Sequence, residues 1–116
     1  MTRFVIDLSV TSKYSMNEIY SGKHWSVRKK TADEIHELTQ WCMIMSLVKK
    51  ELYKKPVVVT ISYDSRLDID NHGWLSKMII DAMKDYILKD DTKKYVKELR
   101  QKFWNGDGIL VEVEEC

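Results

Sequence analysis

The chain has 116 residues and a mass of 13.8 kDa, with 44% hydrophobic and 32% charged residues and a formal net charge of +1. This length predicts one domain with its own core, and two cysteines, Cys42 within an apolar run and Cys116 at the end, exclude a disulfide framework. No apolar run approaches the ~20 residues that span a bilayer, and the N-terminus lacks a signal-peptide layout, so we expect a soluble protein of the cytoplasm.

The first half of the chain predicts a strand, a loop and a helix. Apolar and polar residues alternate in "FVIDLSV" (4–10), which is typical of a half-buried strand, and residues 11–24 have the polar and glycine content of a loop. Thr31 and Glu34 then form a capping-box pattern, which predicts a helix over 31–53 that ends before Pro56. Its apolar stripe contains Ile35, Leu38, Cys42, Met45 and Leu52.

The second half predicts a strand, a helix and a hairpin. The run "VVVTISY" (57–63) favours a central strand buried on both faces, and residues 71–87 favour a helix with Asp70 or Asn71 as its N-cap. Residues 94–104 also suit a helix, but "NGDG" (105–108) followed by "ILVEVEE" indicates that 94–104 and 109–115 are paired strands. The expected order is β-α-β-α-β-β, a mixed sheet with two helices packed against it, in the α/β (α+β) class.

Charges of opposite sign are segregated along the chain. Residues 13–30 hold five Lys or Arg against one Glu, and residues 64–91 hold seven Asp against four Lys or Arg. Such a chain could contact phosphates with one segment and bind cations with the other. Ordinary solvated surface explains the same pattern equally well.

The acidic segment places Asp68 and Asp70 two positions apart. In an extended segment both carboxylates project to one side, and oxygen ligands of this kind suit Mg²⁺ or Mn²⁺ with a phosphate completing the shell. If the following strand pairs near residue 68, Asp91 reaches the same point. A turn or helix cap would also explain the D-x-D pair, and Lys77 with Asp81 could be a surface pair on the helix.

The segment "LDIDNHGWLSKMIIDAMKDYILKDD" (67–91) resembles the central motif of the RusA family of Holliday junction resolvases. The order of elements along residues 1–116 is also similar, and "MNEIYSGKHWSVRKK" (16–30) resembles the N-terminal loop of phage-type members. The resemblance implies a homodimeric, Mg²⁺-dependent endonuclease that resolves four-way DNA junctions by paired nicks, in a bacterial or phage-infected cell. Mn²⁺ could substitute for Mg²⁺.

Site residues follow from the resemblance position by position. Asp68, Asp70 and Asp91 match the metal-binding carboxylates, and Lys77 matches the catalytic lysine, although it follows Asn71 by three residues more than in the founding pattern. Asn71 would orient the Asp70 carboxylate or cap the helix. The predicted DNA contacts from the basic loop are Tyr20, Lys23, His24, Arg28, Lys29 and Lys30.

The sequence leaves three alternatives open. Trp25 could stack at an opened junction or belong to the core, and the extra apolar residues Trp41, Ile44 and Leu47 could form a dimer interface or core. The chain could also be a metal-dependent nuclease for flaps, other branched DNA or RNA. It could finally be a non-enzymatic nucleic-acid-binding module with a structural cation.

Overall fold

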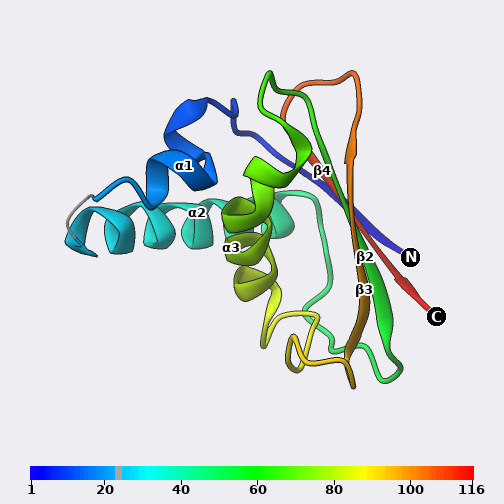
Figure 1. The fold of residues 1–116 in the computed structure, drawn as a ribbon. Coiled ribbons are helices and arrows are strands. Elements are labelled where there is room, and N and C mark those ends of the chain that lie inside the picture. The colour runs from blue at the N-terminus through cyan, green and yellow to red at the C-terminus, as the bar shows by residue number, and fades with distance from the viewer. Residues whose placement is uncertain (23–24) are drawn as a thin grey trace.

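The computed structural model of the chain describes residues 1–22 and 25–116. A four-stranded sheet carries three α-helices, and all three lie on the same side of it (Figure 1). This mixed sheet with helices confirms the predicted α+β class. The elements are β1 (Thr2–Ile6), η1 (Ser12–Tyr14), α1 (Met16–Ile19), α2 (Trp25–Met45), β2 (Val57–Tyr63), η2 (Ile69–His72), α3 (Gly73–Met83), β3 (Val96–Phe103) and β4 (Ile109–Glu115).

The strand order is β1-β4-β2-β3, so the predicted hairpin is wrong. β3 pairs in parallel with β2, with Val59 opposite Leu99, and β4 lies between β1 and β2, antiparallel to both. The turn at 104–108 therefore carries the chain past the end of β2 instead of joining neighbours. Helix α3 makes the crossover that two parallel strands require.

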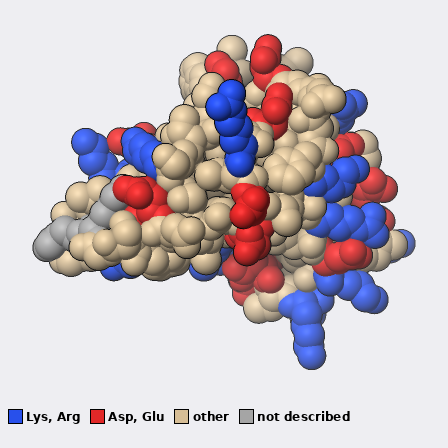
Figure 2. Space-filling model, turned by 45° about the horizontal axis from the view of Figure 1, so that its top comes forward, with Lys and Arg blue, Asp and Glu red and all other residues tan. Residues whose placement is uncertain are grey.

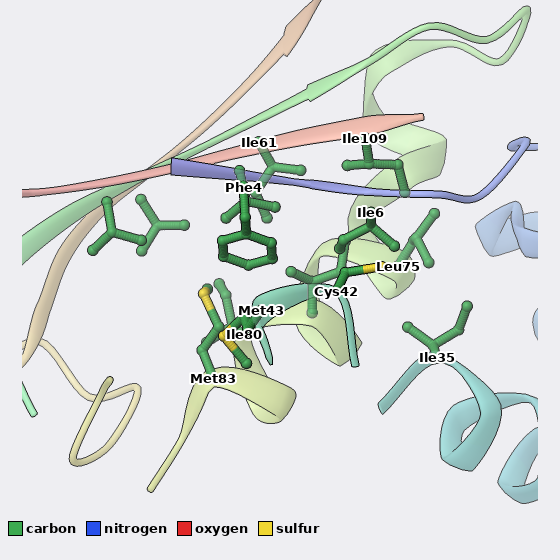
Figure 3. Close-up of a cluster of buried hydrophobic side chains, with 14 of the residues drawn as sticks. Phe4, Ile6, Ile35, Cys42, Met43, Ile61, Leu75, Ile80, Met83 and Ile109 are labelled. Atoms are coloured by element: carbon green, nitrogen blue, oxygen red, sulfur yellow. The ribbon is translucent and has the colours of Figure 1, made fainter. Parts of the chain in front are cut away.

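One face of the sheet and the helices enclose the core (Figure 3). Residues 57, 59, 61 and 63 of β2 are fully buried on this face, and Phe4 and Ile6 of β1 lie beside them. The other face of β2 is only partly covered, because Val58 and Thr60 are half-buried and no helix packs there. β2 is thus central and has its predicted bounds, but it is not buried equally on both sides.

Helix α2 differs from the predicted helix at both ends. It begins at Trp25, so Thr31 is an interior residue whose hydroxyl donates to the Val27 carbonyl, not an N-cap. It ends at Met45, because Leu47 takes a left-handed backbone (φ 60°) and the Val48 amide donates to the Met43 carbonyl. This is a Schellman-type helix end. Its left-handed position is usually a glycine, and because Leu47 occupies it here, the sequence carried no signal for the end of the helix.

The predicted apolar stripes are only partly buried. Ile35 and Cys42 of α2 are in the core, whereas Met45 is 64% exposed and Leu52 lies outside the helix. The apolar spacing of residues 71–87 predicts one buried face, made of Leu75, Ile79, Ala82, Met83 and Tyr86. The first four are buried, whereas Tyr86 lies beyond the end of α3 and is half-buried.

The remaining bounds are also corrected. β1 ends at Ile6, and the expected loop 11–24 contains a 3₁₀ turn and α1, whose N-cap is Ser15. α3 begins at Gly73 after the 3₁₀ turn η2, which takes up both predicted caps, Asp70 and Asn71. In the described parts of the chain, no helix combines the length and apolar character needed to cross a membrane.

Candidate functional site

The D-x-D pair lies on the loop that leaves β2 and enters α3. Asp68 is the N-cap of η2 and Asp70 lies within η2; both are exposed. Within residues 1–22 and 25–116, neither carboxylate takes part in a hydrogen bond or ion pair. The loop therefore presents two carboxylates that have no cationic partner in the described chain.

A buried histidine holds this loop closed. His72 is 0% exposed, its Nδ1 lies 3.1 Å from the Ile69 carbonyl and its Nε2 lies 2.7 Å from the Ser65 hydroxyl. Since a carbonyl only accepts, Nδ1 donates to the Ile69 carbonyl, and Nε2 is hydrogen-bonded to the Ser65 hydroxyl. Ser65 also accepts from the Leu67 amide, so both ends of the loop meet at one side chain.

A second buried layer connects this loop to both parallel strands. The ring of His72 stacks on that of Tyr63 with centroids 4.1 Å apart. The Tyr63 hydroxyl donates to Ser76 at 2.6 Å, and Ser76 donates to Gln101 of β3 at 2.8 Å. Burial raises the pKa of the Tyr63 phenol, so it remains a neutral donor. The D-x-D loop is thus supported by β2, α3 and β3.

The exposed face of α3 carries alternating charges. Lys77 contacts Asp81 at 3.1 Å, as its spacing predicts, and Asp81 contacts Lys84 at 3.2 Å. Lys77 is well exposed, with 62% of its side chain accessible. Its ammonium group can therefore reach a ligand that lies along this face. Leaving Asp81 to do so would cost little free energy, because exposed ion pairs contribute little to stability.

Lys84 is a site residue that the sequence analysis missed. Its ammonium group lies 3.2 Å from Asp91 and 4.0 Å from Asp90, in addition to its contact with Asp81. Burial opposes charge on Lys84, but hydrogen bonds to Asp91 and Asp81 raise its pKa overall. The hydrogen bond from Lys84 lowers the pKa of Asp91. The i, i+3 spacing of Asp81 and Lys84 was the available sequence signal.

The single chain does not bring Asp91 to the D-x-D pair. Asp68 and Asp70 precede the first turn of α3, whereas Asp91 lies against Lys84, directly after its last turn. A helix of 11 residues is about 16 Å long, so it separates the two groups. The expected pairing near residue 68 does not occur, because β3 runs parallel to β2. The first residue of β3, Val96, lies opposite the first residue of β2, Val57, whereas the D-x-D loop follows the last residue of β2. Across the described residues, no group of three or more His, Cys, Asp or Glu could hold a metal.

The predicted DNA contacts at residues 20–30 are only partly described. Tyr20 is exposed and Arg28 lies over its ring at 5.8 Å, while Lys29 pairs with Asp33 at 2.9 Å. Lys30 and Trp25 are also exposed, so Trp25 is not a core residue. Lys23 and His24 lie outside the described residues.

A cavity of about 670 Å³ opens beside the D-x-D loop. The first residues of that loop line it, from Asp64 to Leu67, together with the chain after β1 and the turn before β4. The chain matches no protein-family model and no curated protein.

Proposed function

We propose that this chain is a Mg²⁺-dependent endodeoxyribonuclease that resolves four-way DNA junctions. The observation that carries the proposal is the exposed Asp68 and Asp70 pair on a loop fixed by the buried His72. The motif around it resembles that of RusA resolvases. Rigid support of this kind is what a hydrolytic site needs to keep its ligands in place.

The donor set fits Mg²⁺ at two of the three predicted positions. Asp68 and Asp70 offer exposed carboxylate oxygens without protein partners in the described chain, and Mg²⁺ commonly binds one or two carboxylates plus waters and substrate phosphate. Asp91 fits less well, because Lys84 already neutralises it. Bound to Asp68 and Asp70, Mg²⁺ would polarise the scissile phosphate and activate a water.

Other residues would act directly on the substrate. Lys77, exposed on α3 after the D-x-D loop, would approach a phosphate and stabilise the negative charge that develops during cleavage. Arg28, Lys29 and Lys30 would contact the backbone, with Tyr20 as a stacking surface. On the resemblance to RusA resolvases, we also place the protein in the cytoplasm of a bacterial or phage-infected cell.

Paired nicks in a two-fold junction require two active sites, so we also propose a homodimer. Exposed apolar side chains at the end of α2 support this proposal; they are Trp41, Ile44, Met45 and Leu47, with exposed fractions of 59%, 51%, 64% and 91%. Such residues are depleted on monomer surfaces and typical of interface cores.

A second function is favoured by the ion pairs of Lys84. Lys84 supplies positive charge to Asp81 and Asp91, so these carboxylates need no metal. This favours a non-enzymatic nucleic-acid-binding module in which Lys84 takes the place of the structural cation considered from the sequence. A nuclease for flaps, other branched DNA or RNA would share the site of the proposed resolvase.

One cleavage experiment separates these functions. The protein is incubated with a labelled synthetic junction, a flap, a linear duplex of the same arms and an RNA strand, with Mg²⁺ or EDTA. Paired symmetric nicks in the junction, dependent on Mg²⁺, would support the resolvase. Equal cutting of duplex and junction would point to a different nuclease target, and binding without cutting would indicate the binding module.

A further inference from the structure

We infer that the free edge of β3 contacts the nucleic-acid backbone, an inference that rests on the proposed function. β3 is the last strand of the sheet, so one of its edges has no neighbour among the described residues. Residues 93–102 hold five Lys or Arg against one Glu. This balance equals that of residues 13–30, where the sequence analysis placed DNA binding. Residues 94–104 were interpreted only as one strand of a hairpin with 109–115.

The lysines of this edge are available to a ligand. Lys93, Lys97 and Lys102 are exposed and have no partner among the described residues. By contrast Lys29 is held by Asp33, and Arg28 lies over Tyr20. Figure 2 shows Lys and Arg side chains gathered on the sheet side of the molecule. The β3 edge is therefore at least as open to phosphate as the segment predicted from the sequence.

The spacing of these charges suits a polynucleotide. Lys97 lies at an irregularity in the pairing of β3 with β2, and Lys102 follows five residues later, at most about 16 Å away. This is roughly the rise of five nucleotides on one strand of B-DNA. Leu99 and Phe103 lie between and beside them, 41% and 52% exposed, and Tyr95 is half-buried against Lys94. Cations alternating with apolar and aromatic side chains are typical of surfaces that hold a nucleic-acid strand.

The edge also adjoins the acidic loop. Gln101 accepts from Ser76 of α3, and the Phe103 ring meets His72 edge-on at 5.9 Å. A strand held along β3 would consequently pass toward the loop that bears Asp68 and Asp70. The β3 contact would be made by lysines and needs no metal, so it should persist when divalent ions are removed.

Lysines on an edge strand can instead prevent strands of two molecules from pairing. In that case their removal would promote self-association and leave nucleic-acid binding unchanged. The same variants therefore distinguish the two roles.

The test measures binding of a labelled four-way junction by fluorescence anisotropy in EDTA, over a range of salt concentrations. The variant is Lys97→Ala with Lys102→Ala, and the matched control is Lys49→Ala with Lys54→Ala, which removes the same charge at another cavity. We expect the β3 variant to bind at least tenfold more weakly than the control, with a salt slope shallower by about 2. Circular dichroism establishes that both variants are folded.

Each other outcome has a distinct meaning. Equal affinity and slope for variant and control, with wild-type protein that binds, would overturn the β3 inference and leave the proposed function standing. Wild-type protein that binds no nucleic acid in EDTA would overturn the β3 inference, and the junction cleavage experiment in Mg²⁺ decides the proposed function separately.

Discussion

The Nε2 atom of His72 lies 2.7 Å from the Ser65 hydroxyl, and this contact closes the loop that carries Asp68 and Asp70. In Ser65→Ala the buried Nε2 loses its hydrogen-bond partner, and an unsatisfied buried polar group costs about 1–3 kcal/mol. We expect the free energy of unfolding to fall by that amount in urea titrations. Ser9→Ala, at an exposed serine lining the neighbouring cavity, should have no measurable effect. Equal effects of the two changes would show that the contact does not hold the loop.

The ion pair between Lys84 and Asp91 should make the free energy of unfolding depend on pH. It lowers the pKa of Asp91 below the ordinary 3.8, so their pairing stabilises the fold above that value and is lost as pH falls through the folded-state pKa. Asp91→Asn should therefore be less stable than wild type at pH 7, and this difference should shrink in more acid solution. Urea unfolding between pH 7 and pH 3 measures it, with Asp85→Asn as the control. A difference that stays constant with pH would contradict the pairing.

Leu47 combines a left-handed backbone with 91% exposure. Non-glycine residues in this conformation cost about 1–2 kcal/mol, so Leu47→Gly should stabilise the monomer by roughly 1 kcal/mol. If Leu47 belongs to the proposed dimer interface, Leu47→Gly should also weaken association. Leu47→Ala keeps the backbone cost and should weaken association without stabilising. Light scattering and dilute urea titrations measure both effects; a dimer unaffected by either change would place the interface elsewhere.

Lys77 can be tested separately from its partner Asp81. Loss of an exposed i, i+4 pair costs only about 0.3–0.5 kcal/mol, so Lys77→Ala should fold normally. If the ammonium group stabilises charge during cleavage, the junction cutting rate should fall about 10²-fold at saturating protein. Lys49→Ala, which removes another exposed ion pair, provides the control. An unchanged cutting rate in Lys77→Ala would show that Lys77 has no role in cleavage and only forms a surface ion pair.

Local sequence patterns predicted single helices and strands better than they predicted which strands pair. The β-branched run 57–63 gave the bounds of β2, and the apolar spacing of α3 identified its buried face. The turn before β4 was recognised as well, but a turn sequence does not say which strand lies beside β4. Pairing depends on the complete sheet, in which β2 separates β3 from β4.

The site was predicted in the same partial way. The D-x-D pair and the contact of Lys77 with Asp81 follow from short spacings, and the structure describes both. The place of Asp91 depended on strand direction, and the lysine that neutralises it was not considered. His72 was also missed, because a single histidine in a loop gives no sign that it will be buried with both nitrogens bonded.

The central claim is that Asp68 and Asp70 support metal-dependent cleavage of branched DNA. Junction cleavage in Mg²⁺ by Asp70→Asn tests it most directly, with Asp107→Asn as a control that removes an exposed carboxylate near the same loop. We predict that Asp70→Asn binds the junction at least as tightly as wild type and does not cut it, whereas Asp107→Asn cuts normally. Full turnover by Asp70→Asn would contradict the claim.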